Sequence, residues 1–349
     1  MTFAIARRPI GTGHPPFVIA EMSGNHNQSL ERALALVDAA AASGAHALKL
    51  QTYTADTITL DVRGGDFDIA DPDSLWSGKN LHDLYQQAHT PWHWHEPIMA
   101  RAKQHGLVCF SSPFDESAVD FLEELDVPAY KIASFENNHL PLIAKAASTG
   151  KPLIISTGMA SLGELEQAVA TARSAGCTDL ILLKCTSTYP AAAANTNIRT
   201  IPHLRDLFGC EVGLSDHTMG VGVAVAAVAL GATVIEKHFT LSRADGGVDS
   251  AFSLEPHELQ ALVTETERAW QSLGQVRYGP TEAERKSLVF QRSIYVAADI
   301  AVGECFTAEN LRIVRPGHGA PPHWLEQLIG RPARRAYRRG TPLNLDQLL

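Results

Sequence analysis

Eight short segments rich in aliphatic and β-branched residues recur between positions 17 and 238, and most are separated by segments with helical spacing. They predict strands at 17–21, 45–52, 107–112, 129–134, 153–156, 180–187, 212–217 and 233–238. One intervening helix, at 161–175, begins with Ser161 and Glu164 in capping-box spacing. Parallel strands need a crossover of a dozen or more residues. Eight such units in about 250 residues predict a TIM (β/α)8 barrel rather than an open sheet.

Polar residues follow almost every predicted strand at its carboxyl end. The set comprises Glu21, Lys49, Gln51, Ser111, Ser112, Lys131, Ser134, Ser156, Thr157, Lys184, Ser187, Ser215, His217, Lys237 and His238. The carboxyl ends of barrel strands open onto one face, where TIM-barrel enzymes have their active sites. An ordinary core would not need this pattern, so it predicts a binding face at that end.

Two histidines, His217 and His238, follow neighbouring predicted strands. Neutral imidazole binds Mn, Zn, Fe and similar ions, and two imidazoles leave coordination positions for water and substrate. The alternative is that they are two of 15 histidines with ordinary surface or core roles. Their matched placement favours a metal site. Asp216, Glu236 and Lys237 lie beside them, and we expect these three to support the ligands.

Lysines and serines occur at the same level of the predicted barrel. Lys49, Lys131 and Lys184 lie inside or at the end of apolar segments, where a buried charge is costly without a partner. Cations with hydroxyl donors suit a ligand that carries phosphate and carboxylate. Serine is also common in ordinary turns, but five at successive strand ends favour an anion site: Ser112, Ser134, Ser156, Ser187 and Ser215.

Two of these residues leave alternatives open. Glu21, beside the polar loop at 22–27, suits a general acid or base, but a salt bridge to a neighbouring lysine explains it equally well. Lys131, in AYKIAS, suits a Schiff-base nucleophile of the aldolase kind. The histidine pair favours a metal-assisted reaction without excluding the imine.

The composition is that of an ordinary globular enzyme, with 45% apolar and 19% charged residues. A formal charge of −9 argues against a nucleic-acid partner. No window approaches the roughly 18 apolar residues of a membrane span, and positions 1–16 lack the apolar region of a signal peptide. We therefore expect a cytoplasmic protein. Five cysteines without CxxC spacing are typical of reduced thiols rather than a disulfide or zinc cluster.

The composition changes after Gly274. We predict a barrel domain at 1–274, a polar linker at 275–289 and a small β-rich domain at 290–349. About 60 residues are few for independent stability, so we expect this domain to lean on a partner surface. Its five arginines between Arg331 and Arg339 are expected to form a solvated face.

Over nearly its full length the chain resembles the sialic acid synthase family of phosphoenolpyruvate-condensing enzymes. The shared motifs are IAEMSGNH at 19–26, LKLQTY at 48–53, FSSPF at 110–114, AYKIASFE at 129–136, STGMAS at 156–161, KCTSTYP at 184–190, VGLSDHT at 212–218, GATVIEKHF at 231–239 and VRPGHG at 314–319. The C-terminal part is similar to the antifreeze-like (SAF) domain of these enzymes. Residues 75–95 and the phenylalanine of ASFE resemble the pseudaminic acid synthase branch more than the N-acetylneuraminate or legionaminate branches.

The resemblance implies condensation of phosphoenolpyruvate with an open-chain six-carbon amino sugar, giving a nine-carbon 2-keto acid and phosphate. In the pseudaminate branch the sugar is 2,4-diacetamido-2,4,6-trideoxy-β-L-altropyranose. The family's divalent cation, Mn²⁺ with Mg²⁺ or Co²⁺ as substitutes, would be held by His217 and His238 and would polarise the aldehyde oxygen. Glu21 matches the catalytic glutamate, for which we expect proton handling around the attacking water.

The resemblance also implies binding residues. The phosphoenolpyruvate set matches Lys49, Ser112, Lys131, Ser134, Ser156, Ser187 and Ser215; at Ser187 the sialic branch has asparagine instead. The sugar-side set matches Gln51, Glu136, Tyr189, Asp249 and Phe290, with Asn80 added from an insertion at 61–92 that the sialic branch lacks. Arg315 matches an arginine that one subunit inserts into the barrel of the other, which implies a domain-swapped homodimer.

Two further interpretations are kept. A synthase of the same family could use another amino sugar. A non-catalytic barrel could instead bind a sugar acid and signal through its C-terminal domain, although the presence of Glu21, His217 and His238 speaks against this.

Overall fold

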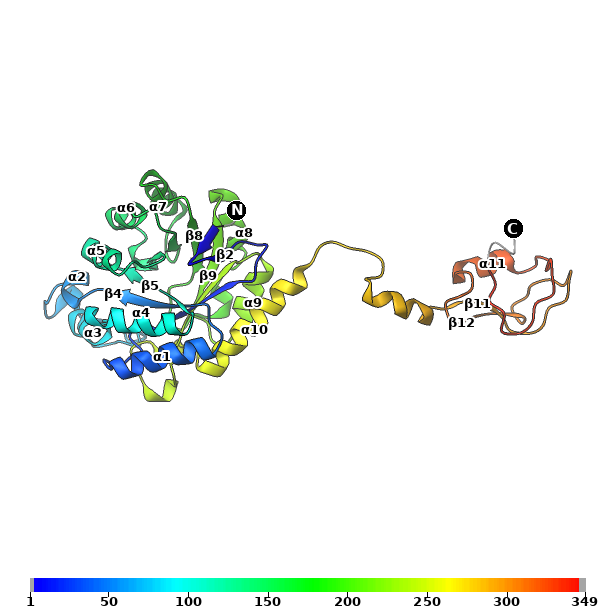
Figure 1. Cartoon of the computed structure of the whole chain (residues 1–349), viewed down its shortest axis with the longest axis horizontal. Coiled ribbons are helices and arrows are strands. Elements are labelled where there is room, and N and C mark those ends of the chain that lie inside the picture. Colours follow the sequence, from blue (N-terminus) through cyan, green and yellow to red (C-terminus); the bar gives the residue numbers. More distant parts are fainter. Residues whose placement is uncertain (1–2, 345–349) are drawn as a thin grey trace. The chain divides into compact units, whose positions relative to one another are not determined.

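The structure is a computed structural model that describes residues 3–344. The chain divides into two compact units, residues 1–274 and residues 275–349 (Figure 1). Within residues 3–344 no helix is long and apolar enough to cross a membrane. All five cysteines are free.

The first unit is a closed barrel of eight parallel strands, as predicted. In order they are β3 (Phe17–Glu21), β4 (Ala47–Thr52), β5 (Val108–Pro113), β6 (Tyr130–Ile132), β7 (Leu153–Ser156), β8 (Leu180–Cys185), β9 (Glu211–Asp216) and β10 (Val234–His238). β10 closes the barrel by pairing with β3, so that His238 lies opposite Glu21. Strand β6 is shorter than expected, because the chain turns after Ile132 into the 3-10 helix η3 (Ser134–Glu136).

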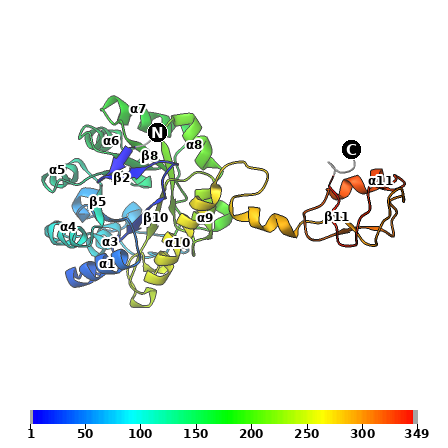
Figure 2. The same ribbon diagram turned by 45° about the vertical axis from the view of Figure 1, so that its right-hand side comes forward.

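Helices surround the strands (Figure 2). They are α1 (Leu30–Ala42), α4 (His95–Gln104), α5 (Glu116–Glu124), α6 (Leu140–Ala147), α7 (Leu162–Ser174), α8 (Thr200–Phe208), α9 (Gly222–Ala229) and α10 (Pro256–Leu273). Side chains cap the amino ends of several helices. Ser29 caps α1, Asp115 caps α5, and Ser161 forms the predicted capping box with Glu164 at α7. Short 3-10 helices η2 (Trp92–Trp94), η4 (Ala193–Asn195), η5 (Arg243–Asp245) and η6 (Ser250–Phe252) lie in the loops.

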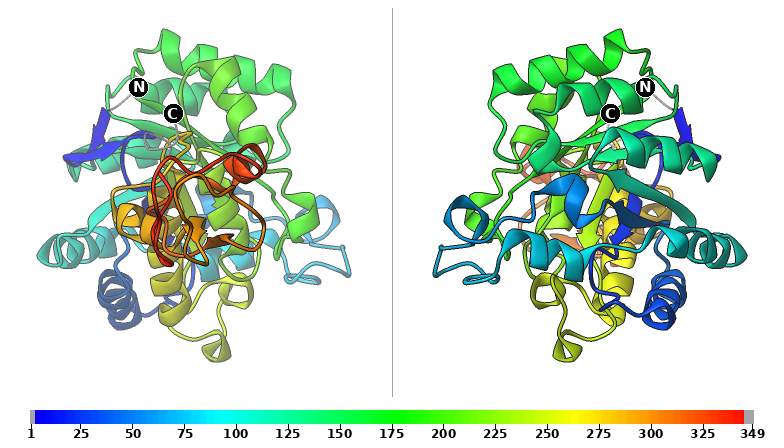
Figure 3. Two further views of the ribbon diagram at one scale, coloured as in Figure 1. Left: turned by 90° about the vertical axis from the view of Figure 1, so that its right-hand side faces the viewer. Right: turned by 90° about the vertical axis from the view of Figure 1, so that its left-hand side faces the viewer.

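An insertion separates β4 from α4 (light blue in Figure 3). It carries α2 (Ala55–Ile58), the 3-10 helix η1 (Gly65–Phe67) and α3 (Leu81–Ala88). Because it leaves β4 at its carboxyl end, it lies on the face of the barrel where the polar strand-end residues are found.

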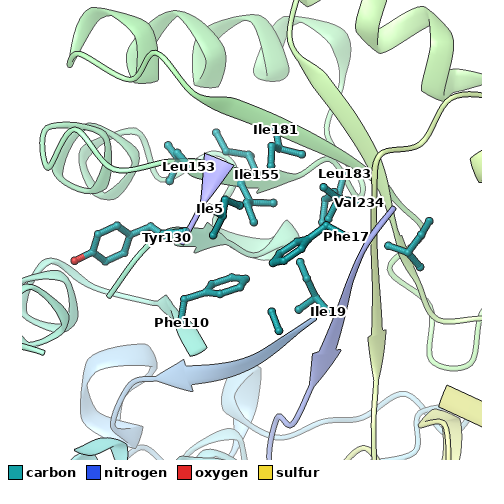
Figure 4. Close-up of a cluster of buried hydrophobic side chains, with 14 of the residues drawn as sticks. Ile5, Phe17, Ile19, Phe110, Tyr130, Leu153, Ile155, Ile181, Leu183 and Val234 are labelled. Atoms are coloured by element: carbon teal, nitrogen blue, oxygen red, sulfur yellow. The ribbon is translucent and has the colours of Figure 1, made fainter. Parts of the chain in front are cut away.

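The amino end of the barrel is filled by apolar side chains. Phe17, Ile19, Phe110 and Leu183, from three strands, point toward one another, and all are fully buried (Figure 4). A hairpin that the sequence did not predict, β1 (Phe3–Ile5) and β2 (Arg8–Ile10), adds Ile5 to this cluster. The interior thus changes from apolar at the amino end to polar at the carboxyl end, and the polar end is where chemistry can occur.

The second unit is built on the antiparallel pair β11 (Ser293–Val296) and β12 (Leu311–Val314). It also contains η7 (Ala283–Phe290), η8 (Pro322–Trp324) and α11 (Leu325–Leu328). Its core is small and includes Ile294, Phe306 and Leu343. Within this unit Ala333 and Tyr337 are buried while the five arginines around them are exposed, as predicted for a solvated face.

Candidate active site

A cavity of about 440 Å³ lies at the carboxyl ends of the barrel strands. Side chains alternate along a strand, so residues two apart, such as Lys49 and Gln51, both face the interior. Most of the residues predicted for the site line this cavity: Lys49, Gln51, Lys131, Ser134, Glu136, Ser156, Tyr189, Ser215, His217, His238 and Asp249.

Glu236 lies at the centre of the charged groups on the cavity floor. Its carboxylate is 3.4 Å from Lys49 Nζ and 3.5 Å from Lys131 Nζ, and it accepts a hydrogen bond of 2.9 Å from Ser215 Oγ. Burial acts to raise the pKa of Glu236, but the charges of Lys131 and Lys49 outweigh it and lower the pKa to about 2. Glu236 is therefore a permanent anion that fixes both ammonium groups.

Glu21 lies on the same floor but in a different state. Its Oε2 is 2.5 Å from Lys49 Nζ, which also donates to Ser112 Oγ at 3.1 Å, and its Oε1 accepts a hydrogen bond from Ser23 N at 2.8 Å. Burial raises the pKa of Glu21 to about 7 despite the neighbouring lysine. Glu21 thus forms the salt bridge that the sequence allowed, and it also titrates where a general acid or base works best.

Hydroxyl groups and Lys131 form a polar cradle at the ends of β6, β7 and β8. Lys131 Nζ donates to Ser156 Oγ at 2.7 Å, and Gly158 N donates to Ser134 Oγ at 3.1 Å. A methyl group added at Gly158 would lie 2.1 Å from Ser187 Oγ and 2.6 Å from Ser134 Oγ. Because Gly158 has no side chain, these two hydroxyls have room to face one ligand. A lysine cation together with hydroxyl donors suits a phosphate or carboxylate group.

Replacing Gly158 by alanine is expected to damage this cradle. Contacts this close force Ser134 and Ser187 aside, so we expect Gly158→Ala to raise the KM for an anionic substrate by at least about 10-fold, the cost of roughly one misplaced hydrogen bond. Steady-state kinetics would measure this. Gly163→Ala is the control, since nothing lies within 4 Å of the added methyl group, and it should leave KM unchanged. Equal kinetics for both variants would contradict the cradle.

His217 and His238 face each other across the cavity, with ring centroids 5.2 Å apart. His217 Nδ1 is 3.0 Å from Thr186 O, which places a proton on Nδ1 and leaves the Nε2 lone pair free. Burial lowers the pKa of His238 well below its ordinary value, and its buried Nδ1 has no hydrogen-bond partner. His238 is thus neutral, as a metal ligand must be. Burial acts to lower the pKa of His217, but its contact with Cys185 outweighs burial and raises that pKa, so His217 would lose a proton when an ion binds. Among residues 3–344 no cluster of three or more His, Cys, Asp or Glu side chains has metal-binding geometry. An ion here would need its other ligands from water and substrate.

The predicted sugar-side residues Gln51, Glu136, Tyr189 and Asp249 line the same cavity as the histidines. The Tyr189 ring lies 4.5 Å from that of His217, and Asp249 Oδ2 lies 3.6 Å from His238 Nδ1 and accepts a hydrogen bond from Ser23 Oγ. Glu136 has a buried Oε2 without a hydrogen-bond partner, and burial raises its pKa to about 7. Together these residues offer polar groups to a neutral ligand, and among them Glu136 Oε2 has no hydrogen-bond partner.

Asp216 and Lys237 turn away from the cavity. Lys237 Nζ donates to Asp216 Oδ2 at 2.9 Å, to Thr218 O at 2.6 Å and to Gly220 O at 2.8 Å. Both residues are next to a histidine in sequence, and the alternation of a strand sends neighbours to opposite faces. The pair therefore fixes the loop that carries His217, which is the supporting role expected for it.

Lys184 and Asn80 both make hydrogen bonds within their own segments of the chain. Lys184 faces outward, where its Nζ donates to Cys185 O at 2.6 Å, and Cys185 lines the cavity in its place. Asn80 caps α3 and donates from Nδ2 to Val62 O and Asp68 Oδ1, both at 2.8 Å. Its amide is thus bonded within the insertion, and its expected contact with the sugar stays a prediction.

Phe290 and Arg315 lie in the second unit, at the end of η7 and directly after β12. Both are exposed within that unit. Their expected contribution to the barrel site stays a prediction.

Some cavity residues were missed in the sequence. Trp76, from the insertion, lines the cavity and donates from its indole nitrogen to Val248 O at 3.0 Å. Cys185 places its Sγ 3.9 Å from His217 Nδ1. Glu236 was noticed but its central role was not, although its position two residues before His238 puts both on the interior face.

Comparisons with known proteins agree with this geometry. The NeuB family profile matches residues 36–278, and the SAF domain profile matches residues 291–349. A pseudaminic acid synthase of Campylobacter jejuni is 43% identical over 327 residues, covering 94% of this chain and 95% of its own. A pseudaminic acid synthase of Helicobacter pylori is 40% identical over 336 residues, covering 96% and 98%.

A solved structure agrees as well. The N-acetylneuraminic acid synthetase of Leptospira borgpetersenii, crystallised with citrate, superposes with a TM-score of 0.74 at 32% identity, covering 82% of this chain and 95% of its own. The family profile spans more than half of the chain, and the resemblance that the sequence motifs carried is confirmed. The chain belongs to the NeuB family and carries an SAF domain at its carboxyl end.

Proposed function

We propose that the chain is a pseudaminic acid synthase. It joins phosphoenolpyruvate to 2,4-diacetamido-2,4,6-trideoxy-β-L-altropyranose and releases pseudaminate and phosphate. The observation that carries this proposal is the 43% identity to a synthase of that name over 94% of the chain. The cavity supports it, because an anion cradle and further polar side chains line the same space, as a reaction between an anion and a neutral sugar requires.

The lysines and serines on the cavity floor bind phosphoenolpyruvate in this proposal. Lys131, Ser134, Ser156 and Ser187 form the cradle, and Lys49 adds a second cation nearby. Glu236 holds the two ammonium groups in place, with Ser112 and Ser215 as their neutral neighbours. Fixed donors of this kind orient the enol so that its C3 faces the sugar aldehyde.

C3 of phosphoenolpyruvate attacks the aldehyde carbon, and a C–C bond forms as the π bond of the aldehyde C=O opens; the aldehyde oxygen gains a proton and becomes a hydroxyl, while positive charge develops at C2. Water adds to C2 and gives up one proton. The C2–O bond to phosphorus then breaks, the remaining hydroxyl proton leaves with phosphate, and C2 becomes the keto carbon. Glu21 accepts the proton of that water, since its pKa of about 7 lets it be deprotonated before the step and protonated after it.

His217 and His238 would hold the divalent metal, with Mn²⁺ as the first choice and Mg²⁺ or Co²⁺ as substitutes. When bound, the ion supplies Lewis acidity toward the aldehyde oxygen. Gln51, Glu136, Tyr189 and Asp249 orient the sugar in the same cavity. We also expect a homodimer in which Phe290 and Arg315 of one protomer complete the site of its partner.

The sugar assignment is tested by phosphate release. With Mn²⁺ and phosphoenolpyruvate present, we expect kcat/KM for the diacetamido-trideoxy altro sugar to exceed that for N-acetylmannosamine by at least about 100-fold. The reason is that the pocket would have to bury hydroxyl groups of the wrong sugar without hydrogen-bond partners. Turnover of N-acetylmannosamine alone would contradict the proposal and favour a neuraminate synthase.

The other interpretations receive no specific support. Lys131 donates to Ser156 and lies 3.5 Å from Glu236, and the Campylobacter jejuni and Helicobacter pylori relatives described above are both named pseudaminic acid synthases.

A further inference from the structure

One wall of the cavity is mainly aliphatic and comes from the insertion between β4 and α4. Ile58, Ile69, Leu81, Leu84 and Ala88 line it. The charged lining residues come from strand ends and the loops that follow them, whereas the polar members of the insertion include Ser74, Trp76 and Tyr85. The cavity therefore has a charged floor and a largely aliphatic wall.

Helix α3 is shaped for this wall. Leu81, Leu84 and Ala88, spaced three and four residues apart, fall on one face of the helix and line the cavity. The opposite face is polar: Asp83 pairs with Arg63, and His82 Nε2 lies 3.0 Å from Asp56 Oδ1. These polar contacts fix the orientation of α3, so that its apolar face is directed to the cavity.

Hydrogen bonds also fix the loop before α3. Asn80 Nδ2 donates to Val62 O and Asp68 Oδ1, and Ile69 N donates to Lys79 O at 2.9 Å, so residues 62–80 close into a compact ring. Trp76 ties this ring to the loop after β10 through Val248 O. Ile69, from this ring, and Leu81, at the start of α3, both line the cavity, so the wall is preformed.

We propose that this apolar wall selects sugars with a methyl group at C6 and rejects those with a hydroxymethyl group. The inference rests on the proposed function, which puts the aldehyde carbon at the polar floor, next to the cradle and the histidine pair. The opposite end of the open-chain sugar then reaches the wall formed by Ile69, Leu81 and Leu84. A methyl group there gains apolar contact, whereas a hydroxyl loses water and finds no partner on the aliphatic side chains.

The expected discrimination is modest but measurable. An apolar pocket rejects an added hydroxyl by on the order of 10- to 100-fold in kcat/KM. Polar side chains placed in the wall should give that hydroxyl a partner and shrink the ratio. We do not expect them to change the KM for phosphoenolpyruvate, because the cradle lies on the floor.

The test compares the 6-deoxy diacetamido sugar with the same sugar bearing a hydroxyl at C6. The variants are Leu81→Asn, close to leucine in size, and Ile69→Thr, both at half-buried positions. Leu60→Asn is the matched control, because Leu60 is 62% exposed and does not line the cavity. Kinetics are measured on protein whose thermal unfolding matches the wild type.

The wild type and Leu60→Asn should prefer the 6-deoxy sugar by about 10- to 100-fold, and at least one wall variant should reduce this to about 3-fold or less. A wild type that uses the 6-deoxy sugar without preference, or wall variants that fold yet keep the full ratio, would overturn the inference while leaving the proposed function standing. A wild type that turns over neither sugar would overturn the proposed function, and the inference with it.

Discussion

Glu21→Gln is expected to lower kcat by about 10²- to 10⁴-fold, the usual contribution of a general acid or base. The amide keeps the shape of the side chain and can still accept the hydrogen bond from Ser23 N. It cannot accept a proton, and burial that raises the pKa of Glu21 to about 7 shows that its surroundings tolerate a neutral group. The fold should therefore survive while the chemical step fails.

The measurement is single-turnover phosphate release with both substrates saturating. KM values for phosphoenolpyruvate and sugar should change by only a few-fold, since Lys49, Lys131 and the serines remain. Glu124→Gln, an exposed carboxyl on α5, serves as the control and should be as active as the wild type. A Glu21→Gln variant within a few-fold of wild-type kcat would remove Glu21 from the chemistry and leave it as the partner of Lys49.

His217→Ala is expected to abolish metal binding and to reduce activity by about 10³-fold or more, because polarisation of a reacting oxygen by a metal contributes several kcal/mol. The proposed metal site has two protein donors, so the loss of His217 would leave His238 alone. Elemental analysis after dialysis should find about one Mn²⁺ per wild-type chain and far less in the variant. The wild type treated with EDTA should lose activity and regain it with Mn²⁺, Mg²⁺ or Co²⁺.

The control for this variant is His203→Ala, an exposed histidine on α8 that should keep both metal and activity. Metal content distinguishes a lost ligand from general damage, since an unfolded variant would also lose its circular dichroism. Full activity in metal-free wild-type protein would show that His217 and His238 serve another purpose, such as positioning the sugar.

Much of the barrel was predictable because its signal is local. Apolar strands and helical spacing repeat eight times, and polar residues mark the carboxyl end of nearly every strand. The direction in which each strand-end side chain points was harder to predict from the sequence. Lys184 and Cys185 are adjacent, and the sequence does not show which of them faces the cavity. The register of β8 decides that Cys185 does.

Contacts between residues far apart in sequence were not predictable. The amide of Asn80, for example, donates to residues 12 and 18 positions earlier. Glu236 gains its low pKa from Lys49 and Lys131, which lie on other strands. The apolar residues of the insertion could not be told from ordinary core residues until their common face and the cavity beside it were visible.

The central claim is that the cavity joins the enol of phosphoenolpyruvate to a 6-deoxy amino sugar through attack of water at C2. Phosphoenolpyruvate labelled with ¹⁸O in its C–O–P bridge tests this directly when incubated with the protein, Mn²⁺ and the diacetamido-trideoxy altro sugar. We predict a nine-carbon 2-keto acid without the label and an equal amount of phosphate that carries it, because the C2–O bond breaks. Label retained in the keto acid, or phosphate released without that product, would contradict the account.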